Sequence, residues 1–126
     1  MKKILIIEDE ELLRQMYAER FEKEGFAVAT ASSAEEGIIA AKREQPDLIM
    51  LDILLPEGSG ITFLAYKNEN KDIKAIPTIA FSNFDEKTTK EQALKLGAVD
   101  YLIKTNFTPQ EIVERVKKVL DSNEKP

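Results

Sequence analysis

Cysteine and histidine are both absent from this 126-residue chain. Without cysteine, the protein has neither a disulfide framework nor a thiol nucleophile. Without histidine, it lacks Ser–His chemistry, histidine metal ligation and phosphohistidine. The formal net charge of -5 argues against direct nucleic-acid binding, because phosphate backbones attract basic surfaces.

Long hydrophobic runs are also absent. Only four aliphatic residues, Ile4–Ile7, separate the basic start of the chain from the acidic residues Glu8–Glu11. A signal peptide needs a longer apolar stretch, and a membrane span needs roughly 18 such residues. We therefore expect a cytoplasmic protein with no membrane partner. The length suits one compact domain, which we place at residues 1–121, with 122–126 as a short tail or linker stub.

Five short apolar runs alternate with amphipathic stretches along the chain. The runs are Ile4–Ile7, Ala27–Ala29, Leu48–Leu51, Thr78–Phe81 and Tyr101–Ile103. Alternation with short connections predicts an α/β fold with a parallel sheet. Continuously apolar strands indicate helices on both faces of that sheet, and the small residues of Ala27–Ala29 favour an edge position.

The predicted helices carry clear start and stop signals. Ser33–Glu36 and Thr108–Glu111 have the spacing of capping boxes, the second with Pro109 at the first helical position. Gly25 and Gly97 are expected to end the first and fourth helices. Two stripes of apolar residues are expected to face the core. They are Leu12, Leu13, Met16, Tyr17 and Phe21 in the first helix, and Ile112, Val113, Val116, Val119 and Leu120 in the last.

Polar side chains follow four of the five predicted strands. Glu8 and Asp9 follow the first strand, Asp52 the third, Ser82 the fourth and Lys104 the fifth. Ligands of open parallel sheets bind beyond the carboxyl ends of the strands. We therefore expect these side chains to meet at one edge of the sheet.

Three carboxylates at one edge repel one another unless a cation intervenes. Oxygen ligands without histidine or cysteine favour a hard ion such as Mg²⁺. Asp52 is the natural nucleophile, because carboxylates form aspartyl phosphates. Mg²⁺, the Lys104 ammonium and the Ser82 hydroxyl could then each neutralise a phosphoryl oxygen.

Three segments resemble the signature blocks of response-regulator receiver domains, the phosphoacceptor modules of two-component signal transduction. They are Ile4–Glu10, Asp47–Pro56 and Gly97–Lys104, and the resemblance covers residues 2–121. It implies a flavodoxin-like, doubly wound sheet of five strands in the order 2-1-3-4-5.

The resemblance also implies a role for each residue at the predicted edge. Asp52 would be the phosphoacceptor and a metal ligand, with Asp9 as a direct Mg²⁺ ligand and Glu8 acting through water. The Leu54 carbonyl would supply a further metal oxygen. Ser82 would be the switch hydroxyl and Lys104 the partner of the phosphoryl oxygens. Tyr101 would be the aromatic that changes rotamer with Ser82, which makes the surface of helix 4, strand 5 and helix 5 the output face.

Three features depart from the family pattern. Thr105 replaces the usual proline after the lysine, and a non-proline cis bond costs about 2.5–4 kcal/mol, which favours a trans peptide and a different loop. The segment from Lys104 to Pro109 is one residue longer than usual. Asn83 stands where a small residue is common and could either crowd the phosphoryl group or donate a hydrogen bond to it.

The resemblance implies a phosphoprotein that catalyses only its own phosphorylation and dephosphorylation. Its phosphodonor would be a histidine kinase or a histidine phosphotransfer protein, and its target a protein that the sequence does not identify. Whether the chain stands alone or is cut from a longer regulator stays open. A pseudo-receiver that binds a partner without phosphorylation is the main alternative. A flavodoxin-like cofactor binder would need a Ser/Thr/Gly-rich loop in place of Glu8–Glu11, and a Mg²⁺-dependent phosphatase would need an acid in place of Leu54.

Each candidate also has a plainer interpretation. Glu8–Glu11 could be an acidic first helical turn, which the helix dipole favours. Ser82 could be an ordinary loop hydroxyl, and Tyr101 a strand aromatic without a function. Asp52 resists such an interpretation, because an unpartnered carboxylate after four buried apolar residues would be costly.

Overall fold

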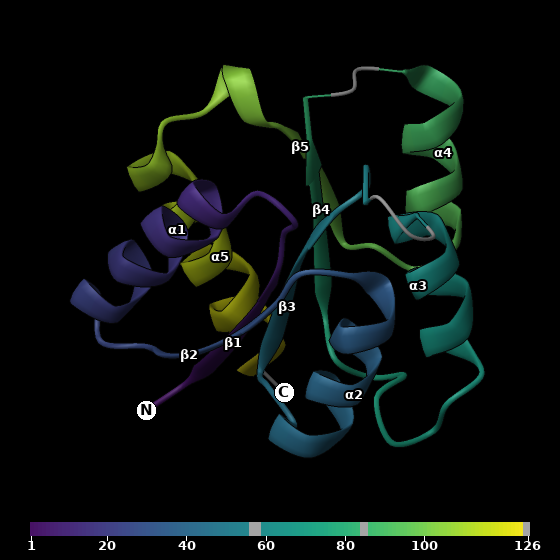
Figure 1. The fold of residues 1–126 in the computed structure, drawn as a ribbon, viewed down its shortest axis with the longest axis horizontal. Helices are drawn as coiled ribbons and strands as arrows, with labels where there is room; N and C mark the ends of the chain where they lie inside the picture. Colours follow the sequence, from purple (N-terminus) through teal and green to yellow (C-terminus); the bar gives the residue numbers. More distant parts are fainter. Residues whose placement is uncertain (56–58, 84–85, 125–126) are drawn as a thin grey trace.

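Five parallel strands form a single sheet in a computed structural model that describes residues 1–55, 59–83 and 86–124. The strands are β1 (Lys3–Ile7), β2 (Ala27–Ala31), β3 (Leu48–Asp52), β4 (Thr78–Ser82) and β5 (Asp100–Ile103). Their order is β2-β1-β3-β4-β5 (Figure 1). The predicted sheet order and the edge position of the second strand are therefore confirmed. Pro56 and Phe84, the latter expected to be a core or surface aromatic, lie outside the described residues.

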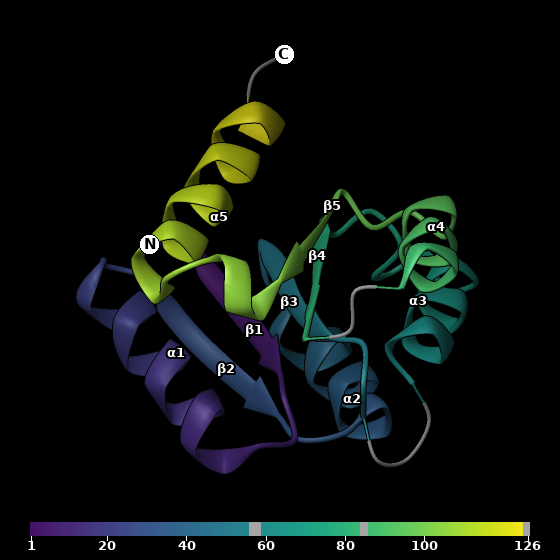
Figure 2. The same ribbon diagram turned by 90° about the horizontal axis from the view of Figure 1, so that it is seen from above.

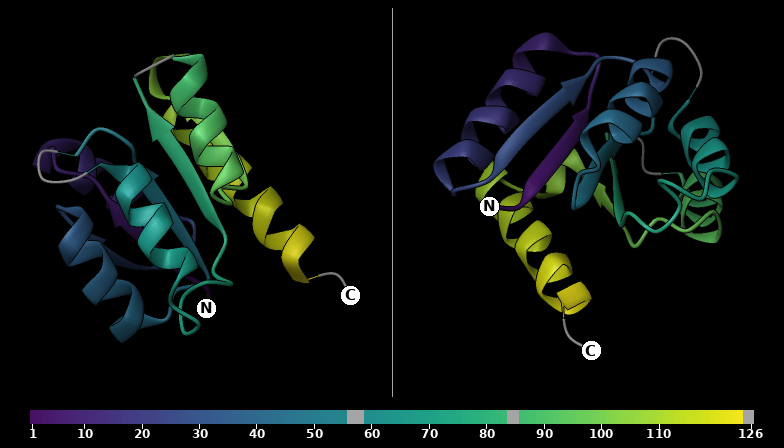
Figure 3. Two further views of the ribbon diagram at one scale, coloured as in Figure 1. Left: turned by 90° about the vertical axis from the view of Figure 1, so that its right-hand side faces the viewer. Right: turned by 90° about the horizontal axis from the view of Figure 1, so that it is seen from below.

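Helices separate the strands and cover both faces of the sheet. They are α1 (Glu11–Lys23), α2 (Ala34–Glu44), α3 (Gly60–Asn68), α4 (Lys87–Lys95) and α5 (Pro109–Glu124), with a short 3₁₀ helix η1 (Lys104–Asn106) before α5. In Figure 1, α1 and α5 lie to the left of the sheet, and α2, α3 and α4 lie to its right. Figure 2 shows the same division from above, and Figure 3 shows α2 and α3 side by side.

Alternate residues of each strand point into two separate cores. Leu5 and Ile49 pack on the side of α2 and α3, whereas Ile4 and Met50 pack against α1 and α5. All four side chains are fully buried. Burial on both faces explains why the strands are continuously apolar.

The predicted helix signals are largely confirmed. The Thr108 hydroxyl accepts a hydrogen bond from the Glu111 N–H (3.1 Å), and the Glu111 carboxylate accepts one from the Thr108 N–H (2.8 Å). Ser33 likewise caps α2 by accepting from the Glu36 N–H. Here, however, the Glu36 carboxylate accepts from the Ser32 N–H (2.8 Å), one residue earlier than in a standard capping box. Gly25 (φ +92°) and Gly97 (φ +103°) follow α1 and α4 in the left-handed region, which glycine adopts without steric cost.

The apolar stripe predicted for the first helix is only partly correct. Tyr17 and Phe21 are buried, but Leu12 is 79% exposed and Met16 is 37% exposed. Helix α1 covers β1 and β2 at one side of the sheet and meets α5, so a narrower stripe is enough to cover its contacts. The last helix also differs from expectation, because α5 continues past the predicted tail boundary to Glu124.

Candidate functional site

Three carboxylates meet at the carboxyl edge of the sheet. Glu8 and Asp9 follow β1, Asp52 ends β3, and these two strands are neighbours. One oxygen of each carboxylate lies within 4.8 Å of one oxygen of each of the others. Glu8 and Asp52 are only 1% and 4% exposed, whereas Asp9 is exposed. The site therefore has a buried floor and one acid open to solvent.

The Lys104 ammonium bridges the two buried carboxylates. Its Nζ atom lies 2.6 Å from Oε1 of Glu8 and 3.2 Å from Oδ2 of Asp52. It also lies 4.8 Å from the centre of the Phe81 ring. Phe81 belongs to β4, between β3 and β5. The lysine side chain thus reaches the acids by crossing the Phe81 ring. The face of an aromatic ring attracts a cation, so this contact favours the ammonium.

Backbone groups fix the orientation of the acids. The Leu54 N–H donates to Oδ1 of Asp52 (3.0 Å), and the Glu10 N–H donates to Oε2 of Glu8 (3.1 Å). Arg14 of α1 also contacts the backbone of Glu8, because its Nη1 donates to the Glu8 carbonyl (2.8 Å). Both oxygens of each buried carboxylate are therefore next to a donor.

The close approach of α3 to the end of β3 requires a glycine. A Cβ atom on Gly60 would lie 2.7 Å from the Asp52 carbonyl oxygen and 2.8 Å from the Ile53 Cα. These backbone atoms cannot move aside as the end of a flexible side chain could. Gly60 therefore allows the first turn of α3 to pack directly against the backbone of Asp52 and Ile53.

The two buried acids differ in proton affinity. Burial raises the pKa of Asp52 to about 7; the Lys104 charge opposes this rise and Glu8 adds to it. Burial also acts against ionised Glu8, but hydrogen bonds from Lys104 and from the Glu10 N–H outweigh it and lower the pKa of Glu8. Burial and the adjacent Glu8 raise the pKa of Asp9. The interaction with Lys104 thus helps to outweigh the effect of burial on the pKa of Glu8 but not on that of Asp52.

The donor set fits a hard divalent cation. Three carboxylates and one ammonium leave an excess of negative charge, and every candidate ligand is oxygen. Mg²⁺ prefers such ligands and keeps several waters, which the exposed side of Asp9 would admit.

Comparison with known proteins identifies the family. Residues 4–117 match the response regulator receiver domain. The chain belongs to this family. It is thus a receiver domain of two-component signal transduction, as predicted from its three sequence blocks.

Relatives of this receiver domain include two transcriptional regulators. The chain is 38% identical over 123 residues to the alkaline phosphatase synthesis regulator PhoP of Bacillus subtilis, covering 98% of this chain and 50% of that protein. It is 34% identical over 119 residues to the phosphate regulon regulator PhoB of Escherichia coli, covering 94% and 52%. The chain thus spans about half the length of these curated relatives.

Solved structures with the same fold include receivers that match nearly end to end. A CheY-like receiver domain protein of Methanospirillum hungatei superposes with a TM-score of 0.91 at 27% identity, covering 98% of this chain and 97% of that one. A two-component response regulator of Clostridium difficile gives a TM-score of 0.91 at 27% identity, covering 99% and 100%.

The remaining predicted residues of this receiver domain lie in different settings. Ser82 ends β4 and is fully buried. Tyr101 of β5 is 6% exposed and packs in the core on the side of α2, α3 and α4. The Leu54 side chain is 53% exposed, and Asn83 is exposed. The switching roles of Ser82 and Tyr101 and the metal role of the Leu54 carbonyl stay predictions.

The loop after Lys104 has the trans geometry that Thr105 favours. Within the described residues no peptide bond is cis, and residues Lys104–Asn106 form η1. Phe107 then leads into the capping box of α5, where the Arg115 guanidinium lies 5.2 Å from the centre of its ring. The segment that we expected to be one residue longer than usual thus contains a short helical turn.

Two contributors to the receiver site were not predicted from the sequence. Arg14 supports the Glu8 carbonyl, and Phe81 lies beneath the Lys104 ammonium. Arg14 lies one turn into the helix that follows the acid pair, and this spacing could have indicated it. Phe81 gives no comparable signal, because an aromatic residue before the end of an apolar strand is ordinary core.

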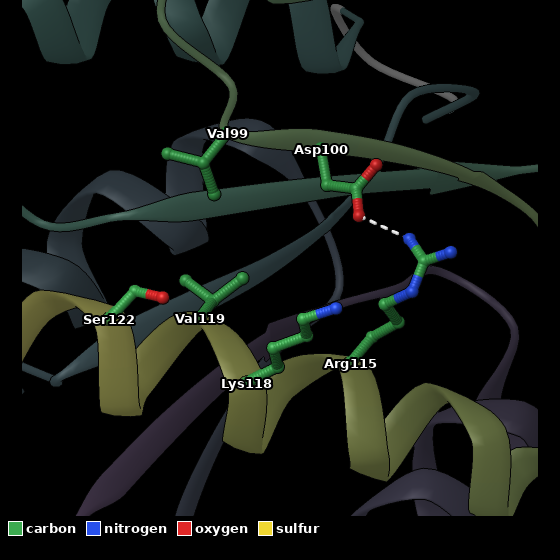
Figure 4. Close-up of a pocket in the computed structure, with 6 residues that line it drawn as sticks. All are labelled: Val99, Asp100, Arg115, Lys118, Val119 and Ser122. Carbon is green, nitrogen blue, oxygen red and sulfur yellow. Dashed lines mark hydrogen bonds and ion pairs between the residues drawn. The ribbon is translucent and has the colours of Figure 1, made fainter.

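A hollow lies at the start of β5, away from the acidic site. It has a volume of about 380 Å³ and is lined by Val99, Asp100, Arg115, Lys118, Val119 and Ser122. Figure 4 shows the ion pair between Arg115 of α5 and Asp100 at the start of β5. Asp100 begins the strand and Lys104 follows its end, so this hollow is separate from the acidic site.

Proposed function

We propose that Asp52 is the phosphoacceptor of this receiver domain and that Mg²⁺ bound at the acidic edge assists the transfer. The observation that carries this proposal is the contact of one ammonium, that of Lys104, with two buried carboxylates, Glu8 and Asp52. A purely structural ion pair would need one acid. The second, whose pKa is raised to about 7, is left for chemistry.

In the proposed reaction, an oxygen of Asp52 attacks the phosphorus of the donor. The new bond joins this carboxylate oxygen to phosphorus while the bond from phosphorus to the leaving group breaks, and the leaving group keeps that electron pair. Lys104 stands beside Oδ2 and can follow the phosphoryl oxygens, and the Leu54 N–H holds Oδ1. Glu8, Asp9 and Asp52 would hold Mg²⁺, with the Leu54 carbonyl as a further ligand. Bound Mg²⁺ neutralises charge on the phosphoryl oxygens.

The donor is proposed to be a histidine kinase or a histidine phosphotransfer protein, since this chain has no histidine. The proposed readout is the surface of α4, β5 and α5, with Ser82 and Tyr101 coupling it to the phosphoryl group. This surface includes the hollow beside Arg115 and Asp100 (Figure 4). Its partner would be a downstream protein in the cytoplasm. We propose no direct contact with nucleic acid or membrane, and no catalysis beyond the domain's own phosphorylation and dephosphorylation.

Incubation with acetyl phosphate tests the proposal. With Mg²⁺, intact-mass spectrometry should show one phosphoryl group on the wild type and none on the Asp52→Asn variant. Asp72→Asn is the matched control, because Asp72 is an exposed aspartate and its variant should be modified like the wild type. Chelation of Mg²⁺ should abolish the adduct. A wild type that binds Mg²⁺ but never gains mass would instead support the pseudo-receiver alternative.

A further inference from the structure

A groove between α2 and α3 lies outside the acidic site. Its volume is about 470 Å³, and its walls include Glu35, Ile38, Ile39 and Lys42 of α2 with Phe63 and Tyr66 of α3. The two helices lie side by side in the left panel of Figure 3. Because both connect parallel strands of one sheet, they also run in the same direction.

The rim of this groove exposes apolar side chains. Ile39 is 55% exposed and Tyr66 is 47% exposed. The opposite side of α2 is used by the fold, since Gly37, Ala40 and Ala41 are buried. Burying Ile39 and Tyr66 against another molecule would release the water that covers them, which favours association.

The two ends of the groove carry opposite charges, so an antiparallel second copy would place each charge beside its opposite. Along α2 the groove residues read as an acid, two isoleucines and a base, at positions 35, 38, 39 and 42. A second α2 laid antiparallel would set Glu35 opposite the second copy's Lys42, and Ile38 opposite its Ile39. Every pair would then occur twice, as a two-fold interface requires.

Within the part of the chain that the structure describes, the two charges that this pairing uses lack an ion-pair partner. Among the described residues, Glu35 makes no hydrogen bond or ion pair, and Lys42 lies 5.5 Å from the centre of the Tyr66 ring. The neighbouring charges of α2 are occupied, because Glu36 bonds Ser32 and Arg43 pairs with Glu44. The charges that remain available are thus those that face the groove.

We infer that two copies of this chain associate through their α2–α3 faces, with the two α2 helices antiparallel. A second copy fits better than a helix of one charge sign, which would meet a like charge at one end of the groove. Helix α2 is about 16 Å long, so the interface is small. A dissociation constant on the order of 100 µM is therefore expected. The inference goes beyond the proposed function and does not depend on phosphorylation.

Sedimentation of the intact chain tests this inference. Between about 5 µM and about 1 mM, the mean mass should rise from 14.2 kDa toward twice that value. Ile39→Asp should keep the protein monomeric. Glu35→Lys and Lys42→Glu should each weaken the dimer at least about tenfold, because each creates two like-charge pairs.

The double variant E35K/K42E distinguishes this pairing from other modes of association. It restores opposite charges across an antiparallel interface, so its dissociation constant should return to within about threefold of the wild type. Glu22→Lys of α1 is the control for an exposed charge reversal and should leave the dimer unchanged, as should Asp52→Asn. A wild type that stays monomeric at 1 mM overturns the inference. So does a dimer insensitive to Ile39→Asp, or a double variant no better than the single ones.

A cysteine cross-link provides a second measurement of the geometry. The chain has no cysteine, so oxidation of E35C/K42C reports only on the introduced residues. The two positions lie about 10 Å apart along one helix, too far for a disulfide within one chain. Oxidation should give a covalent dimer with the double variant and none with E35C alone. A covalent dimer from E35C alone would overturn the antiparallel pairing.

Discussion

At the scale of single residues, the acidic site buries more negative charge than its one ammonium can neutralise. Glu8 and Asp52 are buried with one ammonium between them. An ionised carboxylate without a full counter-charge is costly in such a setting. We therefore expect the pair of buried acids to lower the free energy of unfolding of the metal-free protein.

Replacing Asp52 by Asn should make the metal-free protein more stable. The amide has nearly the same size, keeps an oxygen for the Leu54 N–H, and leaves Lys104 to Glu8 alone. At pH 8 with a chelator, we expect the free energy of unfolding in urea to rise by about 1–2 kcal/mol. Added Mg²⁺ should narrow the gap, because it binds and stabilises the wild type.

The exposed Asp72→Asn variant is the control and should change the free energy of unfolding by less than about 0.5 kcal/mol. An Asp52→Asn variant no more stable than the wild type would show that the buried acid pair does not strain the fold.

At the scale of elements, α3 contains a buried lysine outside the site. Lys67 is 5% exposed, and its Nζ donates to the Lys74 carbonyl (2.8 Å) in the segment between α3 and β4. Burial lowers the pKa of Lys67 below its ordinary value of 10.5. The lysine ties the end of α3 to the chain that enters the next strand, at the cost of a desolvated charge.

The variant Lys67→Met should therefore alter how stability depends on pH. Between the lowered pKa of Lys67 and 10.5, the folded state holds fewer protons than the unfolded state. The wild type should gain stability relative to the variant as pH rises through this window, by at most about 1.4 kcal/mol per pH unit. Urea unfolding of both proteins near pH 7 and near pH 10 measures this difference.

The exposed Lys71→Met variant is the matched control, and its difference from the wild type should stay constant over the same range. A constant difference for Lys67→Met as well would mean that the ammonium remains solvated in the folded protein.

The elements were predictable where a local pattern decides the structure. Continuous apolar runs gave the strands, and the Thr108–Glu111 spacing gave the start of α5. The acids could be grouped because the carboxyl ends of parallel strands share one edge. Helical periodicity reports apolar character but not which neighbours cover it, so Leu12 and Met16 were wrongly expected to face the core. The contact of the Lys104 ammonium with both Glu8 and Asp52 depends on how its side chain crosses Phe81 of β4. No spacing in the sequence encodes that side-chain conformation.

At the scale of the whole molecule, three surfaces are kept apart. The acidic site lies at the carboxyl edge of the sheet, the groove between α2 and α3 lies on one face, and the hollow beside Arg115 lies at the far end of β5. Phosphorylation, self-association and a downstream contact could therefore occur on one domain without competing for space.

The extent of the folding unit can be tested by truncation, since we propose that residues 1–121 form the receiver domain. Leu120 is the last buried residue that the structure describes, and it packs in the core beside Val116. Removal of residues 122–126 should change the free energy of unfolding by less than about 0.5 kcal/mol. Truncation after Lys118 also removes Val119 and Leu120, and should cost at least about 2–4 kcal/mol through the lost burial of Leu120. Urea unfolding of the three chains measures both effects. A large loss from the shorter deletion would place the last turn of α5 inside the cooperative unit and move the domain boundary beyond Asp121.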